Sequence, residues 1–161
     1  YDGLVRILPT GKIQLHCGVG NLGTYSYAAT VRAAAEVLQV NWENCEIVRA
    51  RTDRHLPWSS TQGGSNTIFT HSRANYVAAM DALKKLKEIA AAEFGGSVEE
   101  YDIADERVFK VADPSLGWHS IGPPPPTQSR EPLLEPIVVK RTRAHRSIAA
   151  GGCVNVNDTD K

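Results

Sequence analysis

Two glycine-bearing loops carry the clearest chemical signal in this sequence. The first spans Gly18–Thr24, and the second, Pro57–Ser65, combines two adjacent glycines with several hydroxyl side chains. Each loop lies between a segment with strand-like alternation and a segment with helical periodicity. Glycine leaves the neighbouring main-chain N–H groups accessible, and the N-terminus of a helix attracts anions. The layout therefore predicts one anionic ligand held between two helix N-termini.

The first loop also contains the pattern G-x-G-x-x-G, formed by Gly18, Gly20 and Gly23. This pattern is typical of dinucleotide-binding domains when it joins a buried strand to a helix. The strand of such a domain is an unbroken apolar run, whereas the apolar residues of Ile13–Cys17 alternate with polar ones. No series of strand–helix–strand units follows. Binding of a nicotinamide dinucleotide is therefore the less favoured alternative.

No catalytic set or metal-ligand set accompanies these loops. The five histidines lack the spacing of a zinc-binding helix, and Ser59 and Ser60 lack the glycines that flank a hydrolase nucleophile. The cysteines Cys17, Cys45 and Cys153 form no C-x-x-C pair. We expect small buried side chains, with one reactive thiol as the alternative. The catalytic residues are therefore unknown from the sequence, and no metal ligands are predicted.

The elements that position the first loop are a hairpin and a helix. A β-hairpin with one solvent-exposed face is predicted by two strand-like segments that flank a short turn, Leu4–Leu8 and Ile13–Cys17. We expect Ile13 and Leu15 to point inward. A helix is predicted after the loop, with Thr24 or Ser26 as its N-cap, by the apolar residues Tyr27, Val31, Ala34, Ala35 and Leu38.

The elements around the second loop are a strand and a long helix. Cys45–Ala50 reads as a strand, and the helical period runs from about Thr70 to Phe94, where two glycines follow as a stop. A further short strand is expected at Arg107–Val111. The apolar stripe of the long helix is predicted to contain Tyr76, Ala79, Met80, Leu83, Leu86, Ile89 and Ala90.

These elements predict an α/β fold of the α+β type, with a small mixed sheet, an N-terminal hairpin and two main helices. We assign residues 1–112 to this domain, 113–136 to a proline-rich linker and 137–161 to a short terminal strand segment. Ile137–Val139 is the expected edge strand. The basic run Lys140–Arg146 is interpreted as a solvated junction, since no aromatic residues are interleaved with it.

The composition narrows the function classes. The chain has 161 residues, with 18 basic and 18 acidic side chains, and this balance argues against nucleic acid as a partner. No apolar run approaches the roughly 20 residues that span a bilayer. The start, Tyr1-Asp2-Gly3, lacks an initiator methionine and a signal-peptide pattern, and we expect a part of a longer polypeptide. The expected location is cytoplasmic, with the periplasm as the alternative.

The run from Gln14 to Ala90 resembles the molybdopterin-binding large subunit of the xanthine dehydrogenase/aldehyde oxidase family. That family has a glycine-bearing loop, often G-Q-G, ahead of an alanine-rich helix. It then has a strand, a proline, a serine-rich stretch, a small-small-serine turn and a second helix. The matching residues here are Gly18-Val19-Gly20, Thr52-Asp53, Pro57, Ser59-Ser60, Gly63-Gly64-Ser65 and Arg73-Ala74-Asn75-Tyr76. An alternative register places Gly23-Thr24 at the cofactor.

The resemblance implies a function for the chain. The implied cofactor is molybdenum-molybdopterin, with its dinucleotide form as an alternative. The implied reaction is oxidative hydroxylation of an aldehyde or N-heterocycle. The implied partners are the remaining segments of the large subunit and an iron–sulfur or other electron-transfer subunit. No residue matches the family's active-site glutamate, so we expect the isolated chain to be inactive, and a scaffold without cofactor is the alternative. The implied cofactor contacts are Gly18, Val19, Gly20, Gly63, Gly64 and Ser65.

Overall fold

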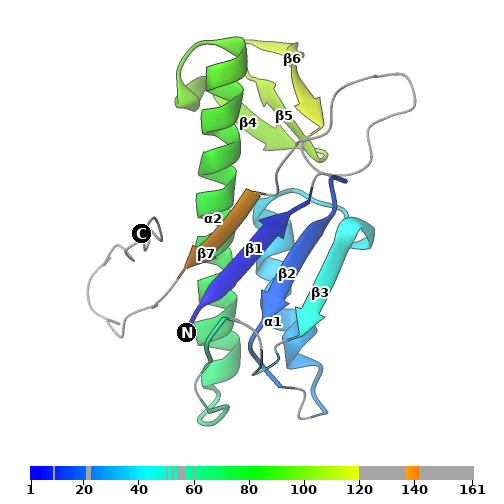
Figure 1. The fold of residues 1–161 in the computed structure, drawn as a ribbon, viewed down its shortest axis with the longest axis vertical. Helices are drawn as coiled ribbons and strands as arrows, with labels where there is room; N and C mark the ends of the chain where they lie inside the picture. Colours follow the sequence, from blue (N-terminus) through cyan, green and yellow to red (C-terminus); the bar gives the residue numbers. More distant parts are fainter. Residues whose placement is uncertain are drawn as a thin grey trace.

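Two sheets pack against one long helix, α2 (Asn66–Phe94), as Figure 1 shows. The structure is a computed structural model, and it describes residues 1–8, 10–20, 23–49, 51, 53, 57–59, 61–119 and 137–141. The other elements in these ranges, in chain order, are β1 (Gly3–Ile7), β2 (Ile13–Cys17), α1 (Ser26–Val37), the 3₁₀ turn Trp42–Asn44, β3 (Cys45–Arg49), the 3₁₀ turn Val98–Glu100, β4 (Tyr101–Ala104), β5 (Arg107–Lys110), β6 (Asp113–His119) and β7 (Ile137–Arg141).

The first sheet has the strand order β3-β2-β1-β7. The predicted hairpin is confirmed, since β1 and β2 pair antiparallel with Val5 opposite Leu15. Helix α1 crosses from β2 to β3, and these two strands pair in parallel. The predicted edge strand is also confirmed, because β7 pairs antiparallel with β1 at the border of the sheet. The sheet is therefore mixed, as expected.

The core lies between this sheet and the two helices. Ile13 and Leu15 point inward, as predicted, and both are almost fully buried. The helices also hold each other through a buried polar contact, since Asn75 Nδ2 donates to the Thr30 carbonyl at 2.9 Å. The largest fully buried side chains are Tyr101, Ile7, Ile13, Leu15, Leu38, Leu86, Val5, Val31, Val108 and Thr30.

The buried face of α2 has smaller side chains than predicted. Its predicted stripe is wrong at Tyr76 and Met80, which are 48% and 42% exposed. The buried face contains Ala74, Ala78 and Ala82 instead, so neighbouring backbones come close to the helix. A Cβ on Gly3 of β1 would lie 2.3 Å from the Ala74 carbonyl oxygen. The helix also begins one turn earlier than predicted, at Asn66.

The second sheet, β4-β5-β6, packs against the C-terminal half of α2 (Figure 1). Only β5 was predicted. Strand β6 pairs antiparallel with β5, so the prediction of a linker starting at residue 113 is wrong for residues 113–119. A tight turn between β4 and β5 holds Asp105 and Glu106 at φ 49° and 61°. This turn places Glu106 against the loop after α1, where its carboxylate accepts hydrogen bonds from Asn41 N and Asn44 Nδ2.

Some predictions fall outside the described residues. These include the linker over 120–136, the basic run beyond Arg141 and the end of the chain from 142 to 161. Within the part of the chain that the structure describes, neither helix has the length and apolar character needed to cross a bilayer.

Candidate cofactor-binding site

The N-termini of α1 and α2 lie at the same end of the molecule. Figure 1 shows both helices starting at the lower end, where β2 and β3 also finish. The first loop leaves β2 to enter α1, and the second loop follows β3 and enters α2. In sheets with parallel strands, ligands bind beyond the carboxyl ends of the strands. The fold therefore brings the two predicted loops to one edge of the first sheet.

Neither helix caps its own N-terminus with a side chain. Tyr25 precedes α1 at φ 52° and Ser65 precedes α2 at φ 57°, and neither side chain makes a capping hydrogen bond. The predicted N-caps Thr24 and Ser26 are therefore wrong. The first turn of each helix also contains no acidic residue. Both positive helix ends are thus left without an anionic or hydrogen-bonding side chain from the helix itself.

The two loops contact each other directly. Ser59 Oγ donates to the Gly18 carbonyl at 2.9 Å, and a Cβ on Gly18 would lie 2.4 Å from the Pro57 carbonyl oxygen. Gln62 continues this contact. Its Nε2 atom lies 3.2 Å from the Gly20 carbonyl oxygen and 3.5 Å from Ser26 Oγ in the first residue of α1. The loops therefore form one continuous surface.

The second loop is tied down at both of its ends by the start of the chain. Asp2 N donates to the Trp58 carbonyl at 2.9 Å, and Trp58 N donates to Asp2 Oδ2 at 3.1 Å. At the other end, Asn66 Nδ2 donates to the Tyr1 hydroxyl at 2.6 Å. The Tyr1 ring contacts Trp58 and stands edge-on to His71, with ring centroids 6.0 and 4.8 Å apart. These contacts anchor the second loop at both of its ends.

The predicted contact residues divide into two groups. Gly20, Gly63, Gly64 and Ser65 are exposed, so their backbones are accessible to a ligand. Gly18 is half-buried against the second loop, and Val19 is 4% exposed with its side chain in the core. Gly18 and Val19 therefore hold the first loop in place, and only their backbone atoms are available to a ligand.

The two adjacent glycines leave open space above the loop. A Cβ built on Gly63 or Gly64 would meet no atom of the chain within 4 Å. Gly64 has φ 57°, in the region where side chains are strained, whereas Gly63 lies outside that region. Close packing within the chain therefore does not explain Gly63. The open surface is instead suited to close approach by a ligand.

Several residues of this site were not predicted from the sequence. Gln62 joins the loops, Asn66 and Tyr1 fix the start of α2, and Tyr25 sets the direction in which α1 begins. Asp53, part of the Thr52-Asp53 pair that matches the family motif, forms an ion pair with Arg51 at 2.8 Å on the surface. Thr52 and Ser60 lie outside the described residues.

A buried histidine stands beside Tyr1, close to the second loop. His71 is 3% exposed, and burial lowers its pKa to about 4. His71 is therefore neutral at physiological pH. Its ring therefore carries no positive charge with which to attract an anion.

Comparison with known proteins identifies the fold family. The model of the molybdopterin cofactor-binding domain matches residues 2–124. This match covers most of the chain and every described helix and strand except β7. The chain belongs to the molybdopterin cofactor-binding domain family. The resemblance stated from the glycine loops is confirmed at this level, and so is the molybdenum-molybdopterin cofactor.

Several solved structures share this fold. A Cu,Mo-containing CO dehydrogenase in its carbon monoxide-reduced state matches with a TM-score of 0.65 and 21% identity, over 86% of this chain and 18% of that one. A reconstituted CO dehydrogenase from Oligotropha carboxidovorans gives the same values. Quinoline 2-oxidoreductase from Pseudomonas putida 86 matches with a TM-score of 0.59 and 19% identity, again over 86% and 18%. A search of curated proteins by sequence finds no match.

The geometry of the site fits this cofactor. A pterin with a phosphate group is anionic and has many hydrogen-bonding edges, which suits two uncapped helix N-termini and an open glycine surface. Among the described residues, no group of three or more His, Cys, Asp or Glu side chains is placed to hold a metal ion. The nicotinamide alternative has little support, since the first sheet contains a single parallel pair of strands rather than a doubly wound series.

Proposed function

We propose that this chain forms one wall of the cofactor site in a molybdenum hydroxylase of the xanthine dehydrogenase/aldehyde oxidase type. The observation that carries the proposal is the pair of uncapped helix N-termini, joined by Gln62 at the end of the parallel strands. Both N-termini direct main-chain N–H groups toward one region. An anionic ligand in that region would interact favourably with both helices.

The residues of this chain bind and orient the cofactor in this proposal. Gly20 and the segment Gly63–Ser65 supply backbone hydrogen bonds to its anionic edge. Gln62 and Ser59 hold the two loops at a fixed separation, and the contacts of Trp58 with Asp2 fix the loop to the sheet. When bound, the cofactor supplies the oxidation chemistry, with water as the source of oxygen.

The substrate class and the partners extend this proposal. The substrate is an aldehyde or an N-heterocycle, and electrons pass to an iron–sulfur or other electron-transfer subunit. The chain spans 18% of the length of the solved relatives. The rest of the large subunit therefore supplies the second wall of the site and the catalytic acid–base residue.

Metal and phosphorus analysis of the native protein tests the proposal. We expect molybdenum and organic phosphate near one equivalent per polypeptide, released together on denaturation. A folded native protein with neither element would support the alternative of a scaffold that binds no cofactor. Release of a nucleotide along with the pterin would establish the dinucleotide form.

A further inference from the structure

A cluster of two tyrosines and an arginine stands at the start of α1, outside the predicted cofactor contacts. It consists of Tyr25, Tyr27 and Arg49, which we call the tyrosine platform. The ring centroids of Tyr25 and Tyr27 are 6.0 Å apart, and the guanidinium carbon of Arg49 lies 4.4 Å from the centroid of the Tyr27 ring. Arg49 Nη2 also donates to the Tyr27 hydroxyl at 3.1 Å. These are the distances of interacting rings and of a cation stacked on a ring.

The first sheet directs Arg49 toward the platform. Arg49 is the last residue of β3 and pairs in register with Cys17, the last residue of β2. Cys17 is buried, and its Sγ lies 3.6 Å from Thr30 Oγ1 of α1. Residues paired in register extend from the same face of a sheet, so Arg49 also extends toward α1, where Tyr27 lies. The platform therefore stands at the carboxyl edge of the parallel strands, the edge at which ligands bind in such sheets.

The platform is accessible and positively charged. Tyr25 is 66% exposed, although its φ of 52° is costly for a bulky residue. Arg49 is exposed as well, and it makes no ion pair with any residue that the structure describes. The first turn of α1 contains no acidic residue, so its main-chain N–H groups add to the positive charge of Arg49. An aromatic surface and a positive charge are therefore available side by side.

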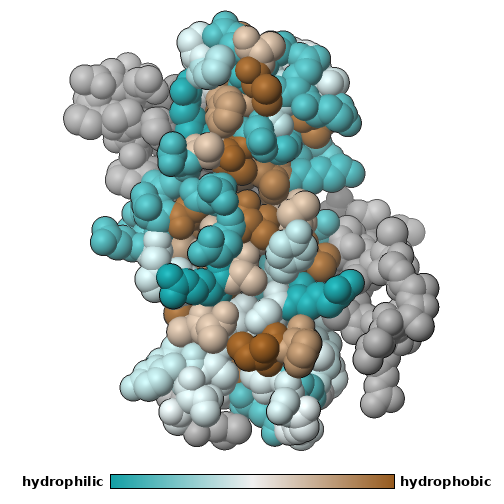
Figure 2. Space-filling model, turned by 180° about the vertical axis from the view of Figure 1, so that it is seen from behind, coloured by the Kyte–Doolittle hydropathy of each residue, from teal (hydrophilic) through white to brown (hydrophobic). Residues whose placement is uncertain are grey.

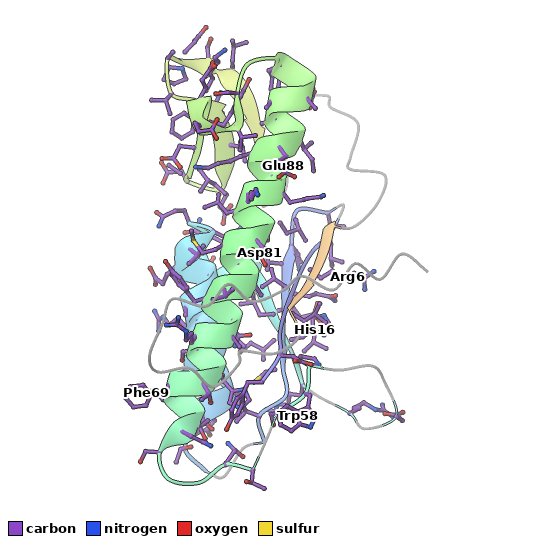
Figure 3. The ribbon with its side chains drawn as sticks, turned by 90° about the vertical axis from the view of Figure 1, so that its left-hand side faces the viewer. Arg6, His16, Trp58, Phe69, Asp81 and Glu88 are labelled. Atoms are coloured by element: carbon purple, nitrogen blue, oxygen red, sulfur yellow. The ribbon has the colours of Figure 1, made fainter. Side chains whose placement is uncertain are left out.

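The platform borders the junction of the two loops. Ser26, between the two tyrosines, has its Oγ 3.5 Å from Gln62 Nε2 of the second loop. Figure 2 shows mostly pale residues of intermediate hydropathy at the lower end of the molecule, where the helices begin. Figure 3 shows Trp58 of the second loop at the same end. A ligand held at the N-terminus of α1 would therefore lie next to the platform.

We propose that the tyrosine platform binds a planar aromatic ring that carries an acidic group. The ring stacks on Tyr25, and the acidic group accepts hydrogen bonds from Arg49 and from main-chain N–H groups at the start of α1. This chemistry has two sources, the nucleotide of a dinucleotide cofactor and a free aromatic acid that enters the site as substrate. The first source rests on the proposed function, whereas binding of a free acid depends on the platform alone.

Two variants of the full-length polypeptide, made in its native host, test this proposal against a matched control. Arg49→Gln removes the charge, and Tyr25→Leu removes the ring while it keeps an apolar side chain. The control is Arg32→Gln, because Arg32 also stands over an aromatic ring, that of Trp42 at 5.7 Å, which follows the other end of α1. All three substituted positions are exposed, so the variants should fold like the wild type.

The first measurement is the nucleotide and molybdenum released when each protein is denatured. If the nucleotide of the cofactor is the occupant, the wild type releases both together. Arg49→Gln should then weaken their retention roughly tenfold, because a hydrogen bond to a charged group is lost. Tyr25→Leu should also weaken it, and Arg32→Gln should not. Equal retention of the nucleotide by Arg49→Gln and the wild type would overturn the platform.

If the wild type releases no nucleotide, a free acid is tested with benzoate as the probe. Benzamide has the same ring without the charge, and acetate has the charge without the ring. In titrations followed by saturation-transfer NMR, the wild type should prefer benzoate to both. The preference over benzamide should disappear in Arg49→Gln and the preference over acetate in Tyr25→Leu, with both kept in Arg32→Gln.

The outcomes separate this inference from the proposed function. Equal binding of benzoate and benzamide by the wild type, or preferences that survive in Arg49→Gln and Tyr25→Leu, would overturn the platform. A native protein without molybdenum overturns the proposed function, and the benzoate titration still decides on the platform.

Discussion

Ser59 Oγ donates a hydrogen bond of 2.9 Å to the Gly18 carbonyl oxygen, and this contact joins two loops that are 41 residues apart in the sequence. The Pro57 carbonyl oxygen lies so close to Gly18 that a Cβ there would be 2.4 Å away. The absence of a side chain at Gly18 therefore allows the two loops to pack closely. Gly20, two residues later, is exposed to solvent.

The close packing of the two loops predicts that alanine substitutions at Gly18 and Gly20 change the stability of the chain by different amounts. Gly18→Ala should lower the free energy of unfolding by about 1–3 kcal/mol, because a methyl group there collides with a backbone oxygen that has to move. Gly20→Ala is the matched control. Its Cβ would meet only Gln62 Oε1 at 3.5 Å, an ordinary contact, so its effect should stay within about 0.5 kcal/mol. Urea denaturation of both variants makes the comparison, and equal effects would contradict the loop contact.

Gly63 provides the sharpest test of the ligand surface. Gly63→Val should reduce the molybdenum retained by the full enzyme by roughly tenfold or more, which corresponds to about 1.4 kcal/mol of lost binding. The reason is that the valine side chain fills the space that a ligand would approach. The thermal midpoint should change little, because a Cβ at this position meets no atom of the chain within 4 Å.

Gly64→Val is the companion variant. Its φ of 57° adds backbone strain, so it should lower both stability and molybdenum content. Retention of molybdenum at the wild-type level in Gly63→Val would remove this loop from the cofactor site.

Much of the fold follows from simple periodicity in the sequence. The alternation around Ile13 and Leu15 predicts both the hairpin and its inward face, and the structure confirms them. The stripe on α2 was misassigned at Tyr76 and Met80 for a physical reason. Large apolar side chains dominate a helical pattern, whereas the buried face here is set by alanines that admit the backbone of β1. Strand β4 was missed because it has only four residues, so its alternation of buried and exposed side chains is short.

The candidate site was predictable only in outline. The glycine loops and their order between strands and helices pointed to an anionic ligand, and the family match supports this interpretation. The role of Gln62 depends on contacts with Gly20 and Ser26, which are 42 and 36 residues away in the sequence. The left-handed conformations of Tyr25 and Ser65 depend on how the loops pack. Neither property has a local signal.

In the turn between β4 and β5, two substitutions separate the energetic effect of backbone strain at Asp105 from that of the hydrogen bonds to Glu106. Glu106→Ala should cost about 1–3 kcal/mol, because Asn41 N and Asn44 Nδ2 lose a charged acceptor at 2.8 and 2.7 Å. Asp105→Gly keeps these hydrogen bonds and removes a side chain from a residue at φ 49°, so it should be neutral or stabilising by up to about 1 kcal/mol. Urea denaturation measures both, and a cost for Asp105→Gly equal to that of Glu106→Ala would contradict this account.

The pH dependence of stability should contain a component from His71. Its pKa is about 4 in the folded chain and near 6.5 in the unfolded chain, because burial disfavours the charged ring. Between these values the unfolded state binds more protons than the folded state. The contribution is therefore complete above about pH 6.5 and is lost as the pH falls toward 4.

Comparison with His71→Gln isolates this component, since the other titrating groups are common to both proteins. The wild-type free energy of unfolding should fall by on the order of 2–3 kcal/mol more than that of the variant between pH 7.5 and pH 4. The same buried ring stands edge-on to Tyr1, which accepts a hydrogen bond from Asn66 at the start of α2. Protonation should therefore loosen the second loop before the whole chain unfolds, and hydrogen exchange of residues 57–66 should rise first. Parallel pH profiles for the two proteins would show that His71 is solvated rather than buried.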